Sequence, residues 1–289
     1  MKDEIKRHKF KKGLPIEFEI LSLKKLFLAN REDMSTSHRT AFFHIIWIQK
    51  GSPIHMVDFK PVKLQPNSML FLNQDVVQHF DSSGNFDGKV ILFTDSFFSK
   101  TKADVNFLKS SILFYDFLSV SKIQLTQTNN IFSELLNQMK QELSNENDPY
   151  LPDIIRNYLR SFLLHAERLR RKQDFIEVEK GELLDQFLLF KDLLEGQFRK
   201  VKAVSNYAAQ LYITEKRLNK ATSMVLGKTP KQVIDDRVML EAKRLLAHST
   251  DSVKQIGFIL GFEEPTNFIK YFRKHQGATP IEFRESLIL

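Results

Sequence analysis

The residues best suited to chemistry are histidines in the front half of the chain, and no cysteine accompanies them. The 289-residue sequence holds eight histidines and no cysteine. Without thiols, the sequence excludes disulfides, thiolate metal sites, cysteine nucleophiles and thiol redox switching. His38, His44, His55 and His79 show no H-x-H pair with a following glutamate, a spacing that would mark a metal site. We therefore expect no metal ion, no cofactor and no catalytic residue, and interpret these four as turn, surface or pocket histidines.

An apolar strand face beside these histidines is a candidate for binding a small-molecule effector. Phe43, Ile45 and Trp47 alternate along one run, so they would share one face of a strand inside a barrel. Polar side chains would lie at the mouth of this pocket: His38, Arg39 and His79. Such aromatic and branched residues more often form ordinary core. The ligand stays open, with a sugar, an amino-acid derivative, a fatty acid or no small molecule as alternatives.

Short β-branched and aromatic runs surround these positions and must build the scaffold. Strands are expected over residues 42–48, 54–59, 62–64, 69–72, 76–80 and 90–93, separated by turns such as 51–53, 66–68 and 82–85. Asn67 suits its turn because asparagine tolerates a left-handed backbone. Strands this short and this regularly spaced predict a sandwich or a small barrel.

Two amphipathic helices follow the predicted strands. Apolar residues recur at helical spacing in two runs: Ile131, Leu135, Leu136, Met139, and Ile154, Ile155, Tyr158, Leu159, Phe162, Leu163. Their apolar stripes would pack either on the barrel or on a second subunit, and we expect a homodimer. The second helix ends in basic residues, which suit the negative end of the helix dipole. Polar residues after it predict a linker over 173–184 between domains at 1–172 and 185–289.

An internal duplication in the last hundred residues is the most informative feature. Five similar pairs are each 49 residues apart: Val204 and Val253, Tyr207 and Ile256, Ala208 and Gly257, Leu211 and Leu260, Ile213 and Phe262. The spacing within each copy predicts a helix, and its small residue lets another helix approach closely. A short break and a second helix follow in both copies. Helix, tight turn and helix is the helix-turn-helix pattern, whose second helix enters the major groove of DNA.

The second helix of each copy shows start signals and inward-facing residues. Thr214 is a good N-cap, with Leu218 returning to the core. Pro265 suits a first turn, and Phe268 and Phe272 supply an inward face at i, i+4. A connector helix is expected over Pro230 to His248, with buried positions at Val233, Val238, Leu240, Ala242, Leu245 and Leu246. Its length of about 27 Å is close to the ~34 Å between successive major grooves on one face of DNA.

These residues resemble the AraC/XylS family of bacterial transcription regulators. The run from Gly261 to Arg284, GFEEPTNFIKYFRKHQGATPIEFR, resembles the family signature G-F-x-(D/E)-x-(S/T)-x-F-x-(R/K)-x-F-(R/K)-(R/K)-x-x-G-x-T-P-x-x-(F/Y)-R. The first copy ends in the similar run from Leu226 to Pro230. The front half resembles the cupin-like sensor domain of this family, although Asn67 replaces the usual glycine and the cupin metal motif is missing. The resemblance implies a cupin-like barrel followed by an all-helical domain.

The resemblance also implies which residues contact DNA. Base-reading residues would lie on the two second helices: Lys216, Asn219, Lys220, Thr266, Asn267 and Lys270. Phosphate contacts would come from four basic residues: Arg217, Lys243, Arg273 and Lys274. For each base-reading residue, a solvated helix face is the alternative. Activation of transcription and a contact with RNA polymerase are likewise implied by the family alone.

Charge and hydropathy are compatible with a DNA-binding protein. The formal net charge is +8, and the part after Leu184, with 17 basic and 12 acidic residues, carries +5 of it. No apolar run reaches the ~18 residues that span a bilayer, and Met1 to Lys12 lacks the apolar segment of a secretory signal. We therefore expect a cytoplasmic protein.

Three other functions are alternatives to sequence-specific regulation. A metal-dependent cupin enzyme fused to a DNA-binding domain and a nonspecific architectural DNA binder stay open. An alkyl-transfer DNA repair protein shares this kind of DNA-binding domain, but its chemistry requires cysteine thiolates, so the cysteine-free sequence excludes it.

Overall fold

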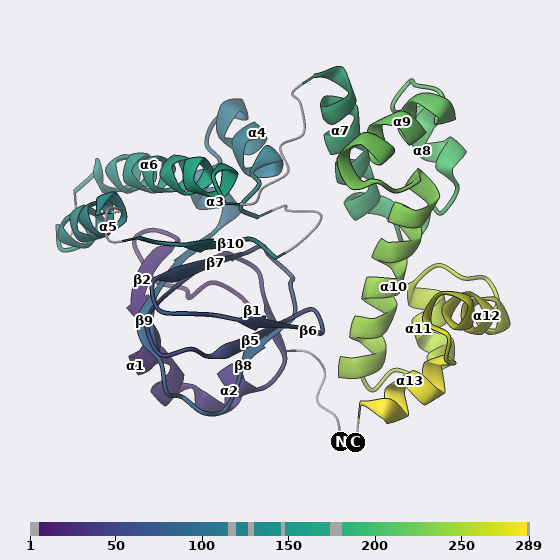
Figure 1. Ribbon diagram of the computed structural model, residues 1–289, viewed down its shortest axis with the longest axis horizontal. Coiled ribbons are helices and arrows are strands. Elements are labelled where there is room, and N and C mark those ends of the chain that lie inside the picture. The colour runs from purple at the N-terminus through teal and green to yellow at the C-terminus, as the bar shows by residue number, and fades with distance from the viewer. Residues whose placement is uncertain (1–5, 115–119, 127–129, 146–147, 174–180, 288–289) are drawn as a thin grey trace. The chain divides into compact units, whose positions relative to one another are not determined.

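The computed structural model describes residues 6–114, 120–126, 130–145, 148–173 and 181–287. The chain divides into two compact units, termed here the front unit (Lys6–Glu177) and the rear unit (Val178–Leu289) (Figure 1). Strands and helices form the front unit, whereas all described elements of the rear unit are helices. The predicted α+β class is therefore confirmed. Most of the predicted linker, residues 174–180, lies outside the described residues.

The described strands of the front unit form two five-stranded sheets, as the sequence predicts for a sandwich or small barrel. Their spatial orders are β1-β3-β8-β5-β6 and β10-β7-β4-β9-β2, and the pairs are antiparallel except for β1 with β3. The first sheet contains β1 (Lys6–His8), β3 (His38–Thr40), β5 (Ile54–Val57), β6 (Lys60–Lys63) and β8 (Gln78–Phe80). The second contains β2 (Phe18–Ser22), β4 (Phe43–Lys50), β7 (Ser68–Leu72), β9 (Asp87–Phe93) and β10 (Lys122–Gln124). The six predicted strands correspond to β4 through β9, and the turn at Asn67 has the expected left-handed φ of 61°.

The two faces of β4 belong to different hydrophobic cores. Ile46 and Ile48 lie in a cluster that includes Val57 and Phe80 of the other sheet, so this face points between the sheets. Residues of the opposite face pack instead with the helices that cover the second sheet: Phe43, Ile45 and Trp47. The sequence-based pocket was therefore assigned to the wrong face of β4. The run is apolar on both faces because this sheet is buried on both sides, so the alternation could not identify the inner one.

Helices α5 (Ile131–Glu142) and α6 (Leu151–Arg171) cover the second sheet. Phe132 of α5 and Phe162 of α6 meet edge to face with their ring centroids 5.0 Å apart. Both helices were predicted, and of the two alternatives for their apolar stripes, packing on the barrel of their own chain is the one observed. Four further helices of the front unit were not predicted: α1 (Leu23–Ala29), α2 (Arg31–Ser35), α3 (Asp95–Phe98) and α4 (Lys102–Ser110).

The rear unit consists of α7 (Glu182–Gln197) and the duplicated segment. The duplicated helices are α8 (Val204–Gln210), α9 (Glu215–Leu226), α11 (Val253–Ile259) and α12 (Pro265–Gln276), and α10 (Pro230–His248) connects the two copies before the last helix, α13 (Pro280–Ser286). The limits of α10 are those predicted. Of its predicted core positions, Val238, Ala242 and Leu246 are buried, whereas Val233, Leu240 and Leu245 are only partly so.

Glycine and proline define the ends of these helices by local backbone physics. Gly227 and Gly277 end α9 and α12 in the left-handed region, with φ of 64° and 80°. Pro230 and Pro280 occupy the first turns of α10 and α13, where a missing N–H costs nothing. The glycine-to-proline spacing therefore ends one helix and starts the next in both copies, as the sequence predicts.

Candidate nucleic-acid interface

The first helix-turn-helix unit is formed by α8 and α9. Tyr207 and Ala208 are buried on α8, and Leu218 is completely buried on α9. The Thr214 hydroxyl accepts a hydrogen bond from the backbone N–H of Arg217 at 3.1 Å, which confirms the predicted N-cap. The predicted base-reading residues of this helix all lie on its exposed face: Lys216, Asn219 and Lys220.

The second unit is formed by α11 and α12 and is packed more tightly. A Cβ atom built on Gly257 would lie 3.2 Å from the Cβ of Phe268, so any larger residue would press against the side chain of Phe268. Phe268 and Phe272 are completely buried and give α12 its inward face. Three exposed side chains on α12 are the predicted base-reading residues: Thr266, Asn267 and Lys270.

The two copies do not keep one register throughout. The first helices of the copies are 49 residues apart, but Thr214 and Glu264, the N-caps of α9 and α12, are 50 residues apart. The turn of the second unit is therefore one residue longer. As a result, Lys216 corresponds to Thr266 and Lys220 to Lys270, whereas the position of Asn219 is taken in α12 by Ile269, which is partly buried.

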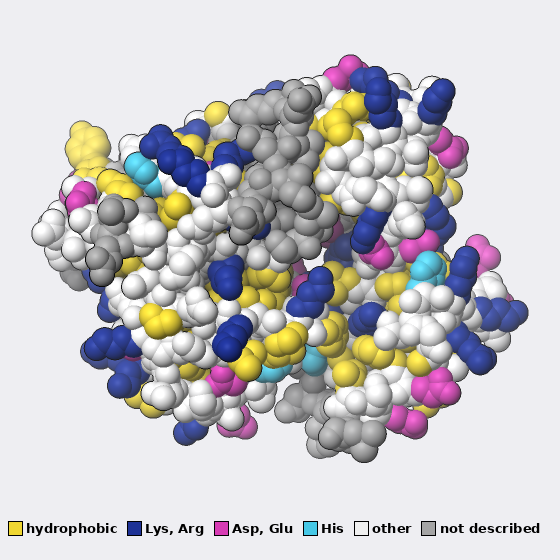
Figure 2. All heavy atoms as spheres, viewed as in Figure 1, with side chains coloured by type: hydrophobic (Ala, Val, Ile, Leu, Met, Phe, Trp, Pro, Cys, Tyr) yellow, Lys and Arg dark blue, Asp and Glu magenta, His cyan; other side chains and the backbone are white. Residues whose placement is uncertain are grey.

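The four predicted phosphate-binding residues differ in their availability. Arg273 and Lys274 are exposed in the last turn of α12, and Figure 2 shows lysine and arginine side chains gathered over this helix. The guanidinium of Arg217 instead bonds to α7, with Nη2 2.6 Å from Glu182 Oε2 and Nε donating to Gln186 Oε1 at 2.9 Å. It therefore has partners within the unit before any DNA is bound.

Lys243, another of the predicted phosphate-binding residues, lies close to an aromatic ring of a neighbouring helix. Its ammonium lies 5.9 Å from the centroid of the Phe283 ring of α13. Burial lowers the pKa of Lys243, and Asp236 partly opposes that shift. This lysine packs on the neighbouring helix instead of standing free in solvent.

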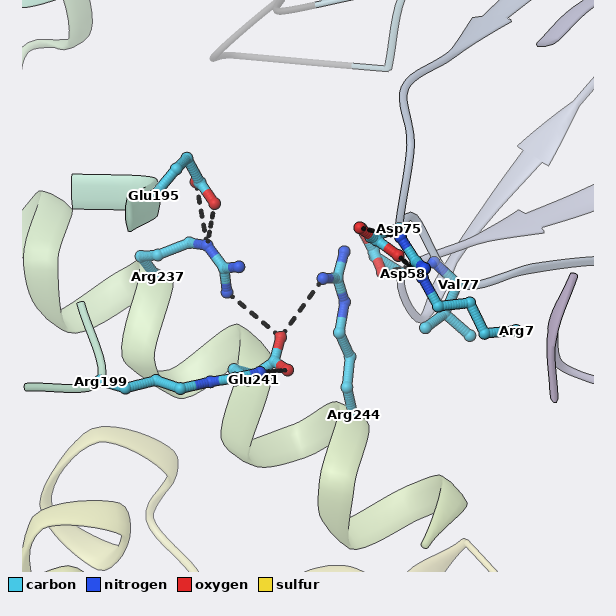
Figure 3. A network of polar contacts seen from close by, with 9 residues as sticks. All are labelled: Arg7, Asp58, Asp75, Val77, Glu195, Arg199, Arg237, Glu241 and Arg244. Atoms are coloured by element: carbon cyan, nitrogen blue, oxygen red, sulfur yellow. Dashed lines mark hydrogen bonds and ion pairs between the residues drawn. The ribbon is translucent and has the colours of Figure 1, made fainter. Parts of the chain in front are cut away.

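A buried carboxylate in the connector joins α10 to the end of α7. Glu241, which is 2% exposed, accepts hydrogen bonds from Arg199 at 3.0 Å, Arg237 at 3.3 Å and Arg244 at 3.5 Å (Figure 3). Arg237 also donates to both carboxylate oxygens of Glu195 on α7, each at 2.9 Å. A buried carboxylate is tolerable here because guanidinium groups satisfy its oxygens.

A second buried carboxylate joins the connector to α12. Asp235 accepts a hydrogen bond from the Tyr271 hydroxyl at 2.7 Å and one from Lys231 at 2.5 Å. Burial raises the pKa of Tyr271, and the hydrogen bond and charge of Asp235 raise it further. The tyrosine therefore remains a neutral donor, and α12 is held against α10 at a defined position.

Of the four front-unit histidines considered in the sequence, His44 and His55 are buried. Burial lowers the pKa of His44 and of His55 to about 3, so both are neutral. His55 Nε2 is 2.9 Å from Gln78 Oε1, while His55 Nδ1 and Gln78 Nε2 are buried without a hydrogen-bond partner. His38 and His79 are half-buried, as is Arg39. Among the described residues, no group of three histidine or acidic side chains could hold a metal ion.

Family models match both the front unit and the rear unit. A helix-turn-helix domain model matches residues 207–286, and a model of the AraC-like ligand-binding domain matches residues 29–151. The chain belongs to the AraC family of transcription regulators. The resemblance found in the sequence is confirmed over both units.

Relatives of this AraC-family chain include HTH-type transcriptional regulators from several bacteria. RhaR of Salmonella dublin, an HTH-type transcriptional activator, is 20% identical over 260 residues, which are 88% of each chain. YisR of Bacillus subtilis, an uncharacterised HTH-type regulator, is 32% identical over 92 residues, and the match spans only 32% of its length. RhaS of Escherichia fergusonii, also an HTH-type activator, is 29% identical over 92 residues, 32% of this chain and 33% of RhaS.

Two solved structures are also similar to this chain. ToxT of Vibrio cholerae O395 is 16% identical, covers 94% of this chain and 98% of its own, and gives a TM-score of 0.44. An AraC-type regulator from Chromobacterium violaceum is 22% identical, covers 36% of this chain and 92% of its own, and gives a TM-score of 0.32. In the described part of the AraC-family chain, no helix is both long enough and apolar enough to cross a membrane.

Sequence reasoning missed the buried polar groups of this AraC-family chain. Asp235 and Glu241 look like solvated charges on a helix surface, because Tyr271 and Arg199, which complete their burial, come from distant segments. Gln78 and His55 are 23 residues apart and meet only across paired strands. The alternation of His44 with Ile46 and Ile48 on one face of β4 was the available signal for the inner histidine.

Proposed function

We propose that this AraC-family chain is a sequence-specific DNA-binding regulator that activates transcription through two groove-reading helices, α9 and α12. The observation that carries the proposal is the repeated helix-turn-helix unit, in which buried residues fix the second helix and leave a polar face exposed. Exposed lysine and asparagine side chains are suited to base edges, since lysine donates to guanine O6 and N7 and asparagine pairs with adenine.

In this proposal, the base-reading residues are those on the exposed faces of the two helices: Lys216, Asn219, Lys220, Thr266, Asn267 and Lys270. Arg273 and Lys274 bind phosphates, which fixes the register of α12 without reading sequence. Arg217 and Lys243 support the proposal less well, because Glu182 and the Phe283 ring already contact them.

A small-molecule effector bound by the front unit is the second part of the proposal. Its support is the match to a ligand-binding domain model and the buried polar atoms that lack partners, His55 Nδ1 and Gln78 Nε2. His55 and Gln78 belong to the first sheet, whereas His44 lies on the face of β4 opposite to Phe43 and Trp47. In this proposal, these three side chains donate to or accept from a polar ligand. The names of the RhaR and RhaS relatives support activation, and contact with RNA polymerase follows from it.

Homodimerisation through α5 and α6 stays part of the proposal, but with less support than the sequence offered. The apolar stripes of both helices are used within the chain, where they cover the second sheet. Leu164 of α6, 48% exposed, is an apolar side chain outside that packing. Sedimentation of the purified chain measures the dimer directly.

The decisive experiment is selection of bound sequences from random double-stranded DNA, followed by affinity measurement on the selected site. Specific regulation predicts a selected motif in two parts and an affinity at least ~10³-fold above that for random DNA. A ratio near one at physiological salt would identify a nonspecific architectural binder and overturn the proposal. Mapping of bound sites in cells, with and without small molecules, then gives target genes and effector.

A further inference from the structure

A short segment between α7 and α8 contacts the turn of the second helix-turn-helix unit. Lys202, in this segment, donates from Nζ to the backbone oxygens of Leu260 at 2.7 Å and Arg199 at 2.9 Å, and Gly261 O lies 3.5 Å away. The same ammonium lies 4.7 Å from the centroid of the Phe262 ring. Leu260 is the C-cap of α11, so a positive charge here binds at the negative end of that helix.

The backbones of the segment and the turn are also in direct contact. Gly261 has a φ of 75°, and a Cβ atom at this position would lie 1.9 Å from the carbonyl oxygen of Arg199. Only glycine fits both the conformation and this approach. The second helix-turn-helix unit is thus packed against the segment that leads into the first. The side chain of Lys202 links this segment to the turn of the second helix-turn-helix unit.

The segment is held on its other side by the connector and by α7. Arg199 donates a hydrogen bond to Glu241 of α10. Phe198 is buried, and the guanidinium carbon of Arg237 lies 3.9 Å from the centroid of its ring. Arg217 of α9 bonds in turn to Glu182 and Gln186 of α7. A continuous series of contacts therefore runs from α9 through α7 and the segment to the turn that precedes α12.

Among the described residues of this series, Lys202 is the one whose side chain donates hydrogen bonds to the carbonyl groups of the turn. Burial lowers the pKa of Lys202, with the charge of Lys231 contributing. A partly desolvated ammonium is stabilised here by carbonyl oxygens and by a ring face, and a neutral side chain cannot replace these interactions.

We propose that Lys202 is a positioning residue that fixes the separation of α9 and α12, so that the chain binds two half-sites at one spacing only. The inference rests on the proposed reading of DNA by both helices. It extends that function, because the selectivity for the spacing between half-sites would depend on a residue that does not contact DNA.

The first test compares K202M with K200M on DNA. Methionine keeps the length of the side chain and removes the ammonium. Lys200 is an exposed lysine of the same segment with no side-chain partner among the described contacts, so K200M is matched in charge. Each full-length variant is titrated against the selected two-part site, the same site with 2 bp inserted between its halves, and each half-site alone.

Wild type and K200M should lose on the order of 30-fold in affinity on the 2-bp insertion, because one set of base contacts is lost. K202M should lose less than about 5-fold, with half-site affinities within about twofold of wild type. A merely structural role would weaken all four complexes together. An unchanged insertion penalty in K202M overturns the positioning role, whereas failure of wild type to select any DNA overturns the proposed function itself.

The second test measures the separation without DNA. Since the chain has no cysteine, S223C in α9 and K274C in α12 can carry a pair of spin labels. Pulsed electron resonance should give one narrow distance distribution in the wild-type background and in K200M, and a broadened one in K202M. A distance distribution that is already broad in the wild-type background overturns the proposal. This measurement therefore tests the proposal even if K202M fails to fold.

Discussion

Removal of one hydroxyl at Tyr271 tests how α12 is held on the connector. In Tyr271→Phe the ring keeps its neighbours, with Phe262 and His275 at centroid distances of 5.1 and 4.6 Å, and only the hydrogen bond to Asp235 is lost. Hydrogen bonds to charged acceptors contribute about 1.5–3 kcal/mol. Because Asp235 retains Lys231 at 2.5 Å, the lower end, about 1.5 kcal/mol, is expected.

This loss should lower the melting midpoint of the rear unit by about 6 °C for a unit of roughly 100 residues. Circular dichroism at a helical wavelength follows the transition. The single tryptophan, Trp47, is buried in the front unit, and its fluorescence verifies that this unit stays folded. Tyr212→Phe is the matched control, because Tyr212 is 96% exposed and should change nothing.

The difference in stability between wild type and Tyr271→Phe should depend on pH. The pKa of Tyr271 is raised in the folded state, so the neutral form is favoured there. Its contribution is fully present below the unfolded value of about 10 and is lost as pH rises above it. Wild type should therefore approach Tyr271→Phe in stability at alkaline pH. An unchanged midpoint in Tyr271→Phe at pH 7 would refute the assigned role of the hydrogen bond.

Four further predictions follow from the structure. Glu241→Gln should destabilise the rear unit by about 2 kcal/mol in urea, because a neutral amide leaves the surrounding guanidinium groups without their charge-assisted bonds; equal stability would contradict this. Asn219→Ala should weaken binding by about 1–3 kcal/mol and relax specificity at one base pair, measured on a panel of single-base operator variants; unchanged operator binding would count against its placement. The front unit should lose stability as pH falls below the unfolded histidine value of about 6.5, because the pKa values of His44 and His55 are lowered to about 3 in the fold; Trp47 fluorescence should show a shallower pH slope in His55→Gln. Tyr212→Gly should stabilise the first unit by roughly 1 kcal/mol, since Tyr212 has a φ of 55°; a loss of stability would show that its ring has a contact not accounted for.

Local backbone physics explains why most helix limits could be predicted from the sequence. Gly277 ends α12 and Pro280 starts α13 for reasons contained in those residues alone. The cap at Thr214 is equally local. The short strands β1 and β10, by contrast, have three residues each and exist only because a partner strand lies beside them.

Tertiary partners explain why part of the candidate site could not be predicted. Arg217 has the residue type and helix position of a phosphate contact, but its partner Glu182 lies 35 residues earlier in the chain. No local sequence pattern predicts the ion pair between Arg217 and Glu182. The inner face of β4 was similarly undetermined, because Ile45 and Ile46 are equally apolar and only the helices over one face distinguish them.

The two copies of the duplicated unit have diverged where their surroundings differ. At equivalent turn positions, the first copy has Tyr212 in a left-handed conformation and the second has Gly261. Both backbones need a positive φ, and a side chain is tolerated in the first because nothing is packed against it. In the second, the carbonyl of Arg199 occupies the place of a Cβ. Glycine here is therefore explained by the docking of the second unit, and the contact that excludes a side chain is the one that Lys202 completes.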